Sequence, residues 1–185
     1  MKTTKNEILE TAARLVETEG VERVTLAQVG AALNISHAAL YKHFANKQDL
    51  WTSLALKWLD EILVAIFPFD TTGYDSRLQI AHDWLWALAN GKMTAYRNDA
   101  QMFKLYTDYI DANPAVLALH INDLVRSFAA ATGLDDPTLI NGILQAFTYF
   151  TTPAFAEAWN EDSQAQFEAI WQLVTPGLES ALAKP

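Results

Sequence analysis

The stretch that decides the fold is LAQVGAALNISHAALYKHFANKQDLW, from Leu26 to Trp51. Two short segments with apolar residues at helical spacing flank Asn34, and Asn is one of the few residues other than Gly that adopt the left-handed conformation of a tight turn. Ser36 and Asn46 stand where two further helices are expected to begin, because such side chains cap helix N-termini. The stretch therefore predicts two short helices joined by a tight turn and then a longer helix from Lys47 to about Ile66.

Another helix is expected before this stretch. Thr4 and Glu7 have the spacing of a capping box, and Gly20 is suited to end the helix. A second capping box, formed by Thr25 and Gln28, opens the first short helix. Two short helices joined by a tight turn and braced by a longer one are typical of a helix-turn-helix, in which the second short helix enters the DNA major groove.

The composition favours an all-α protein with a substantial core. Of the 185 residues, 51% are hydrophobic, and apolar residues recur at helical spacing without convincing period-two alternation. The sequence has no Cys, which excludes disulfides and thiolate metal sites and is compatible with a reducing compartment. No secretory signal is recognisable, and the longest apolar run, ILVAIFPF, is too short to span a bilayer. We therefore expect a cytoplasmic protein with no membrane partner.

The chain is expected to form two domains. Pro68 and the DTTG sequence at 70–73 mark the boundary, which predicts a helix-turn-helix DNA-binding domain over 1–48, with a connecting helix over about 47–66, and an all-helical ligand-binding and dimerisation domain over 67–185. In the second domain we expect helices near residues 75–90, 94–111, 114–131, 136–159 and 163–183. Pro153 and Pro176 lie inside two of these helices, where we expect kinks or restarts.

Charge is distributed unevenly along the chain. Residues 1–57 contain seven Lys or Arg residues and six Asp or Glu residues. The remainder contains six Lys or Arg residues and sixteen Asp or Glu residues, so the net charge of the chain is −9. An acidic protein does not bind polyanions over its whole surface, but this balance permits a locally basic face at the N-terminal end. The alternative is that Lys42 and Lys47 are simply solvated charges on helices.

Side chains between Thr25 and Lys47 suit contacts with double-stranded DNA. Small Ala residues allow a helix to approach the groove closely, and an Ala methyl can pack against a thymine methyl. Hydroxyl groups, ammonium groups and the N-terminus of the Lys47 helix suit phosphates. Alternatively, Tyr41 packs against the core and the His residues are ordinary surface residues. The predicted DNA-binding residues are Thr25, Gln28, Ser36, His37, Ala38, Tyr41, Lys42, His43 and Lys47.

The same segment resembles the DNA-binding domain of the TetR/AcrR family of transcriptional regulators. The resemblance covers about residues 5–55, with two departures: Asn34 at the turn, where the family usually has Gly, and Gly30, where Ala is usual. It implies a homodimer, held together through about residues 136–183, that represses transcription from a palindromic operator. The matching residues are Thr25–Leu26, Val29, Ile35–Ser36, Leu40–Tyr41, His43–Phe44, Lys47 and Leu50.

The resemblance also implies a pocket in the second domain, whose small hydrophobic or aromatic effector releases the protein from its operator. Aromatic side chains at helical spacing are commonly core residues, and His82 on such a helix can equally be a core histidine. With Tyr109, Asn122 and Thr151 as candidate polar anchors, the residues expected to line the pocket are His82, Trp86, Phe103, Tyr106, Phe147 and Phe150.

Two other classes of protein remain as alternatives. One is an all-helical protein that binds a small molecule or a partner without binding DNA. The other is an enzyme, for which Asp108, Asp111, His82 and His120 offer carboxylates and bases. The sequence shows no nucleophile–base pair and no phosphate-binding glycine loop. We therefore expect no catalytic residues, no metal site and no cofactor.

Overall fold

The computed structural model describes residues 3–183, so residues 1–2 and 184–185 of the two predicted domains lie outside it. Within 3–183 every regular element is a helix, which confirms the all-α class, and the one strand-like feature is an isolated bridge between Ile66 and Phe69. The chain divides into two compact units: residues 1–61 with 99–116, here called the N-terminal unit, and residues 62–98 with 117–185, here called the C-terminal unit. No helix within the described residues is long and apolar enough to cross a membrane.

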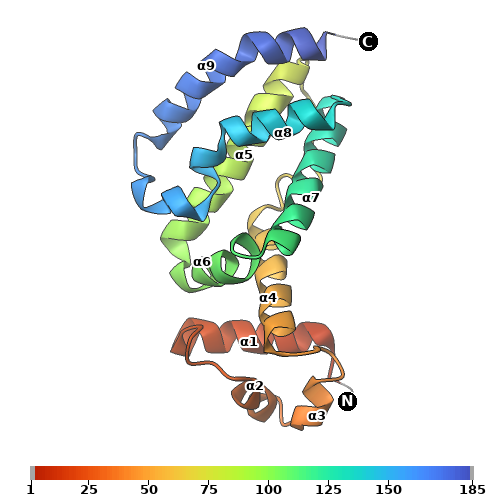
Figure 1. Cartoon of the computed structure of the whole chain (residues 1–185), viewed down its shortest axis with the longest axis vertical. Helices are drawn as coiled ribbons and strands as arrows, with labels where there is room; N and C mark the ends of the chain where they lie inside the picture. Colours follow the sequence, from red (N-terminus) through yellow and green to blue (C-terminus); the bar gives the residue numbers. More distant parts are fainter. Residues whose placement is uncertain (1–2, 184–185) are drawn as a thin grey trace. The chain divides into compact units, whose positions relative to one another are not determined.

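The N-terminal unit begins with the predicted helix-turn-helix (Figure 1). Capping boxes are present at Thr4 and at Thr25, as predicted. The Oγ of Ser36 accepts a hydrogen bond from the backbone N–H of Ala39, and Asn46 Oδ1 accepts one from that of Asp49 at 2.9 Å. The helices of this unit are α1 (Lys5–Glu19), α2 (Leu26–Ala32), α3 (His37–Leu40), α4 (Lys47–Ile62), α6 (Ala100–Tyr106) and the π-helical turn η1 (Thr107–Asp111).

The turn between α2 and α3 has the predicted conformation. Asn34 has a φ of 53°, the left-handed value that its position in the turn requires. Gly30 is buried, and a Cβ there would lie 3.2 Å from the carbonyl oxygen of Ile35. A larger residue would therefore press on the turn, which explains why Gly is tolerated inside α2. The side chains of Leu40 and Phe44 are almost completely buried and hold α3 against the rest of the unit.

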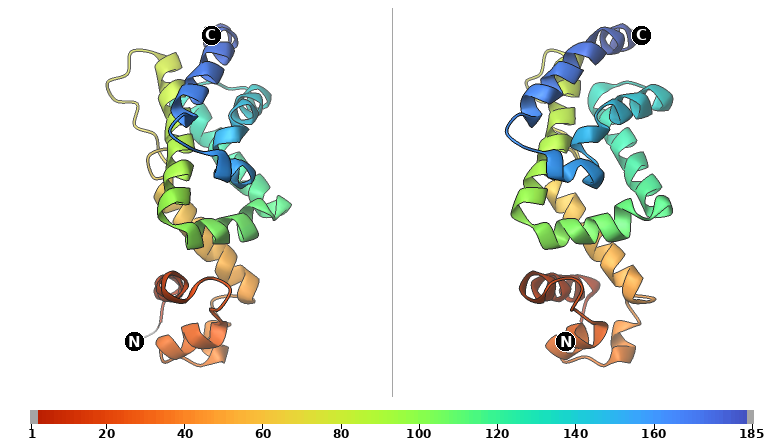
Figure 2. Two further views of the ribbon diagram at one scale, coloured as in Figure 1. Left: turned by 90° about the vertical axis from the view of Figure 1, so that its left-hand side faces the viewer. Right: turned by 60° about the vertical axis from the view of Figure 1, so that its left-hand side comes forward.

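The C-terminal unit is built around α5, against which α9 packs (Figures 1 and 2). Arg77 joins the ends of three helices, because its guanidinium donates to the carbonyl oxygens of Thr132 at 2.6 Å and Leu182 at 2.7 Å. A cation at these helix C-termini satisfies carbonyl groups that have no partner inside a helix. The elements are α5 (Arg77–Asn98), α7 (Pro114–Thr132), α8 (Pro137–Ala146), the 3-10 turns η2 (Thr148–Phe150) and η3 (Pro153–Ala158), and α9 (Ser163–Leu182).

The predicted helix break between residues 90 and 94 is wrong. The helix α5 runs without interruption to Asn98, and Asp99 then caps α6 by accepting a hydrogen bond from the backbone N–H of Met102. Gly91 lies inside α5 because a Cβ there would come within 3.1 Å of the carbonyl oxygen of Ile62. Close packing thus keeps a poor helix former inside the helix.

The prediction of one continuous helix from residue 136 to Pro153 is wrong, whereas the restart expected at Pro153 is confirmed, because η3 begins there. The helix α8 ends at Ala146 and is followed by η2 and η3. Pro153 has no N–H to donate to the carbonyl oxygen of Tyr149, four residues earlier, and the indole Nε1–H of Trp159 donates to that oxygen instead, at 2.7 Å. By contrast, α9 continues through Pro176 without the predicted restart.

Candidate nucleic-acid interface

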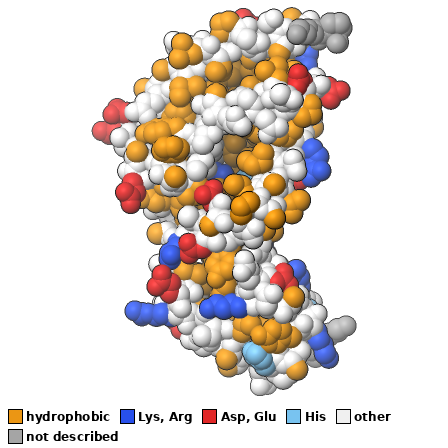
Figure 3. Space-filling model, in the orientation of Figure 1, with side chains coloured by type: hydrophobic (Ala, Val, Ile, Leu, Met, Phe, Trp, Pro, Cys, Tyr) orange, Lys and Arg blue, Asp and Glu red, His pale blue; other side chains and the backbone are white. Residues whose placement is uncertain are grey.

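The polar side chains predicted to contact DNA are mostly exposed on one short part of the N-terminal unit. The segment from Ser36 to Lys47, here called the reading segment, carries α3, the following turn and the start of α4. His43 is half-buried, whereas Ala38, Lys42 and Lys47 are exposed. Figure 3 shows Lys and Arg side chains spread over the N-terminal unit. The segment thus presents donors and cations to solvent on a scaffold fixed by buried Leu40 and Phe44.

The side chain of Tyr41 packs against a neighbouring ring and is also exposed to solvent. Its ring lies edge-on to the imidazole of His37, with the ring centroids 4.7 Å apart, and 43% of the residue is exposed. Tyr41 is therefore not a core residue, and the His37 ring restricts its position. A fixed aromatic ring with an exposed hydroxyl loses little conformational freedom when it binds a partner.

The start of α4 is held by reciprocal hydrogen bonds. The backbone N–H of Asp49 donates to Asn46 Oδ1 at 2.9 Å, and the carboxylate of Asp49 accepts the backbone N–H of Ala45 at 2.8 Å. The ammonium of Lys47 lies 5.9 Å from the centre of the Trp51 ring, and that of Lys5 lies 5.0 Å from the Phe44 ring. Both ammonium groups therefore have a defined place over an aromatic ring. Lys5 was not among the predicted DNA-binding residues, because it lies in α1, outside the segment from Thr25 to Lys47 in which they were sought.

The polar side-chain atoms of Thr25 and Gln28 form hydrogen bonds with other groups of the same protein. The hydroxyl of Thr25 donates to Gln28 Oε1 at 2.8 Å and accepts the backbone N–H of Gln28 at 3.2 Å. The amide of Gln28 also donates to the carboxylate of Glu19 at 2.7 Å. These bonds fix the start of α2 relative to the end of α1. A contact of these two residues with DNA remains a prediction.

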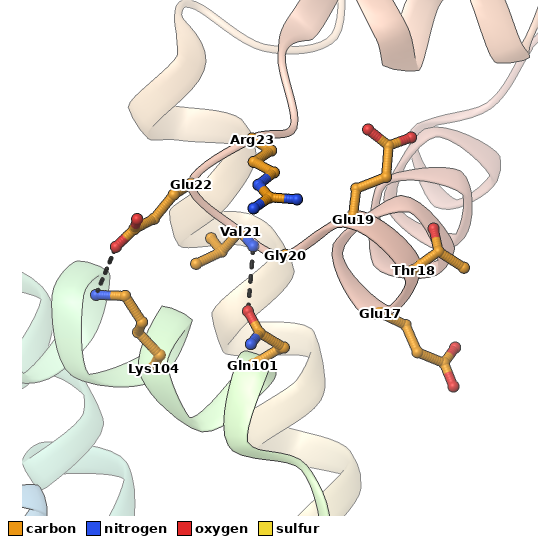
Figure 4. A pocket seen from close by; sticks show the side chains of 9 residues that line it. All are labelled: Glu17, Thr18, Glu19, Gly20, Val21, Glu22, Arg23, Gln101 and Lys104. Carbon is orange, nitrogen blue, oxygen red and sulfur yellow. Dashed lines mark hydrogen bonds and ion pairs between the residues drawn. The ribbon is translucent and has the colours of Figure 1, made fainter.

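An open, polar pocket of about 500 Å³ lies on the N-terminal unit, between the connection from α1 to α2 and α6 (Figure 4). Gln101 Oε1 accepts the backbone N–H of Val21 at 3.3 Å, and Lys104 pairs with Glu22 at 3.6 Å and with Asp108 at 3.0 Å. These contacts join the helix-turn-helix to α6. Nothing in the spacing along the sequence links residues 21–22 to residues 101–104, so sequence reasoning missed this connection.

The predicted pocket residues fall into both units. In the N-terminal unit, Phe103 and Tyr106 pack with Trp58. Tyr106 is almost completely buried, and this burial raises the pKa of its hydroxyl. Tyr109 is half-buried, and burial raises its pKa as well. The structure thus gives these aromatic side chains a place in the packing around α4 and α6.

The other four predicted pocket residues gather around Phe167 of α9. His82, Trp86, Phe147 and Phe150 all have ring centroids between 4.8 and 5.7 Å from that of Phe167. The structure therefore brings these four together, although whether they contact an effector remains a prediction.

His82 also makes polar contacts in this cluster. Its Nδ1 lies 2.6 Å from a carboxylate oxygen of Asp83, and its Nε2 lies 3.1 Å from one of Glu168. The histidine therefore bridges α5 and α9. Of the candidate polar anchors in this unit, Asn122 is exposed, and Thr151 is half-buried and donates to the carbonyl oxygen of Thr148.

Two buried titratable side chains of the C-terminal unit were not among the predicted site residues. Lys92 on α5 is 3% exposed and His120 on α7 is 5% exposed. Burial, with the positive charge of Lys92, lowers the pKa of His120 to about 3. Lys92 follows Leu88 and Trp84 at intervals of four residues, which is the signal that would have placed it on the buried face of α5. Within residues 3–183, no group of three or more His, Asp or Glu side chains is arranged to hold a metal ion.

Comparison of the sequence with known proteins gives matches to the N-terminal unit. Residues 8–54 match the family described as bacterial regulatory proteins, tetR family. Curated relatives include the nucleoid occlusion factor SlmA of Cronobacter sakazakii, 34% identical over 61 residues, and that of Vibrio campbellii, 36% identical over the same length. Each match covers 32% of this chain, and 30% and 31% of the respective relatives. The chain therefore matches about a third of the length of these curated relatives.

Solved structures share the fold over almost the whole chain. BioQ of Mycobacterium smegmatis is 21% identical, with a TM-score of 0.57, and the match covers 97% of this chain and 99% of BioQ. A structure of BioQ with its double-stranded DNA operator has 22% identity and a TM-score of 0.55, over 95% and 98% of the two chains. SCO0253, a TetR-family transcriptional regulator from Streptomyces coelicolor, has 21% identity and a TM-score of 0.58 over the full length of both. These likenesses show an N-terminal helix-turn-helix followed by further helices.

Proposed function

Through residues 8–54 the chain belongs to the tetR family of bacterial regulatory proteins, and we propose that it is a DNA-binding transcriptional regulator. The observation that carries this proposal is the reading segment, in which Ser36, Tyr41, Lys42 and Lys47 expose polar side chains around a buried Leu40. A regulator of this kind acts where the genome lies, in the bacterial cytoplasm.

We propose that α3 enters the major groove and that the residues around it bind phosphates. Ala38 is exposed and small enough to leave space for base edges, and His37 is exposed beside it. The hydroxyl of Tyr41 and the ammonium groups of Lys42 and Lys47 suit phosphate oxygens on either side. The structure of BioQ with its double-stranded DNA operator supports a DNA complex of this fold.

We propose that the protein is a homodimer through α8 and α9, within residues 136–183. The exposed face of α9 includes Ala165, Ala169, Leu173 and Pro176, and Leu173 is 81% exposed. On α8, Gly142 is also exposed. Small and apolar residues on an exposed helix face allow close helix packing and are costly to leave in water. A two-fold dimer presents two reading segments, so its operator is palindromic.

We propose that the dimer represses transcription and that a small hydrophobic or aromatic effector releases it. The effector favours one conformation of the protein and acts only through its different affinity for the two conformations. Within the N-terminal unit, the bonds from Gln101 to Val21 and from Lys104 to Glu22 offer a route by which a displacement of α6 reaches the helix-turn-helix.

The experiment that tests this function is selection of bound sequences from a random duplex DNA pool by the purified full-length protein. Enrichment of a palindromic site, bound with an affinity that falls steeply as salt rises, is the expected result. Failure to enrich any sequence at low salt contradicts the proposal and favours a helical protein that binds a small molecule or a partner without DNA.

A further inference from the structure

Lys5, the first residue of α1, has its charged group beside the reading segment. The ammonium lies 5.0 Å from the centre of the Phe44 ring, and Phe44 follows α3 inside the reading segment. Figure 1 shows the first turn of α1 and α3 at the same end of the helix-turn-helix. A cation from a different helix is therefore held next to the residues that we propose to contact DNA.

The sequence of α1 explains why the Lys5 side chain takes this direction. The buried residues of α1 include Ile8, Ala12 and Val16. Lys5 precedes Ile8 by three residues and Ala12 by seven, so it begins the same face of the helix. The aliphatic part of a lysine packs along such a face while its ammonium stays in water. The ring of Phe44, which is 1% exposed, then restricts the position of the ammonium.

Within the part of the chain that the structure describes, the ammonium of Lys5 forms no ion pair. The two acidic residues of the first turns of α1 have other partners. The carboxylate of Glu7 accepts hydrogen bonds from Thr4, and that of Glu10 accepts one from the side chain of Asn6 at 2.7 Å. The positive charge of Lys5 is therefore available to a partner.

A cation at this end of a helix is unfavourable for stability. The N-terminus of an α-helix carries a partial positive charge, which favours acidic side chains and disfavours basic ones. Lys5 begins α1, a helix of 15 residues. Residues that break a rule of local stability are expected mainly at functional sites. The position of Lys5 is therefore better explained by a partner than by the stability of α1.

We propose that the ammonium of Lys5 binds a phosphate of the DNA backbone, an inference that rests on the proposed function. Lys47 lies over the Trp51 ring in the same manner, so two ammonium groups on core rings hold α3 in the groove, one from α1 and one from α4. A lysine whose position is already restricted loses less conformational freedom on binding. The capping box at Thr4 uses backbone N–H groups at the start of α1, so the side chain of Lys5 makes the contact.

The test uses the full-length protein and fluorescence anisotropy, with the operator enriched by selection and with a random duplex of the same length. Lys5→Met removes the charge and keeps an apolar chain over Phe44. Each phosphate of the operator is replaced in turn by an uncharged methylphosphonate. Arg14→Met is the matched control, because Arg14 is exposed on the same helix. It lies about two and a half turns after Lys5 and therefore on the opposite face.

For the wild type, a methylphosphonate at the phosphate that Lys5 binds is expected to weaken binding about tenfold. For Lys5→Met the same replacement has almost no effect, because the contact is already absent. Lys5→Met also lowers the slope of log affinity against log salt by about one, on the operator and on random DNA alike, since a phosphate contact carries no sequence information. Arg14→Met gives the wild-type slope and the wild-type methylphosphonate profile.

The melting temperature separates a lost contact from a damaged fold. Lys5→Met removes a cation from a helix N-terminus, so its melting temperature is expected to equal or exceed that of the wild type. Weaker DNA binding together with a lower melting temperature would assign the effect to folding and overturn the proposal.

Two further outcomes distinguish this inference from the proposed function. If the wild type binds the operator but Lys5→Met has the same salt slope or the same methylphosphonate profile, the Lys5 contact is overturned and the regulator stands. If no sequence is enriched and the wild type binds no duplex DNA at low salt, the regulator is overturned together with the contact.

Discussion

Tyr41 and His37 form an edge-on aromatic pair at the surface of the helix-turn-helix, with ring centroids 4.7 Å apart and planes at 73°. They lie four residues apart, one helical turn, so each ring limits the rotamers of the other. The pair therefore gives the exposed Tyr41 hydroxyl a defined place before any partner arrives.

Replacement of Tyr41 by Phe tests the role of this hydroxyl. Tyr41→Phe keeps the packing against His37 and removes one donor to a phosphate, which we expect to weaken operator binding by about tenfold. Fluorescence anisotropy with a labelled operator measures the change, and Tyr74→Phe, in the C-terminal unit, is the matched control. Unchanged affinity for Tyr41→Phe would show that the hydroxyl does not touch DNA.

Lys47 is expected to contribute through charge. Lys47→Met keeps an apolar chain over Trp51 and removes the phosphate contact, so the slope of log affinity against log salt falls by about one. Lys57→Met removes the same charge from α4 at a lysine paired with Glu61 and leaves the slope unchanged. Equal slopes for Lys47→Met and the wild type would remove Lys47 from the interface.

The conformation of the turn between α2 and α3 leads to a prediction about the stability of the folded protein. Asn34 has a φ of 53°, which most residues adopt at a cost of about 1–2 kcal/mol and which Gly adopts freely. Asn34→Ala is therefore expected to lower the free energy of unfolding by about 1 kcal/mol, whereas Asn34→Gly leaves it nearly unchanged. Urea denaturation distinguishes the two variants, and the same loss for both would contradict the conformational explanation.

Leu173 tests the proposed dimer. Leu173→Lys places a charge on the exposed face of α9, and we expect the protein to sediment as a monomer and to lose affinity for a palindromic site. Leu119→Lys changes another exposed leucine, on α7, and serves as the control. Sedimentation of wild type as a monomer at micromolar concentration would contradict the proposal outright.

Burial of His120 is expected to make the stability of the protein depend on pH. Its pKa is about 3 in the folded protein and 6.5 for an ordinary histidine, so the unfolded chain binds its proton more readily. The stability that the neutral, buried imidazole provides is present above pH 6.5 and is lost as pH falls toward 3, by about 1.4 kcal/mol per pH unit. The difference in unfolding free energy between wild type and His120→Gln is expected to narrow over this interval. A constant difference from pH 7 to pH 4 would exclude this effect.

Local chemistry made the helix starts predictable. The caps at Thr4, Thr25, Ser36 and Asn46 depend on hydrogen bonds between residues three positions apart, and all four are present. The left-handed turn at Asn34 is likewise a property of one residue. Most of the helix-turn-helix could therefore be read from the sequence, and the exposure of the reading segment follows from the apolar spacing around it.

Tertiary packing decided what the sequence did not predict. In the sequence, Gly91 is typical of a helix end, but in the structure it lies inside α5, close to the carbonyl oxygen of Ile62. The division of residues 136–159 into shorter helices involves the hydrogen bond from the indole of Trp159 to the carbonyl oxygen of Tyr149. The predicted pocket set combines Phe103, which packs with Trp58, and Phe147, which packs with Phe167 in the other unit. Aromatic spacing shows that a side chain is buried, but not which neighbours it meets.

The most direct test of the central claim is the affinity of the selected operator for the double variant Tyr41→Ala with Lys47→Glu. The variant removes a hydroxyl and reverses a charge on the reading segment, while both residues are exposed enough to leave the fold intact. We expect sequence-specific binding to be lost, whereas the variant Lys57→Glu with Tyr74→Ala binds the operator as the wild type does. Wild-type affinity in the Tyr41→Ala, Lys47→Glu variant, with its helical circular dichroism unchanged, would show that this surface does not read DNA.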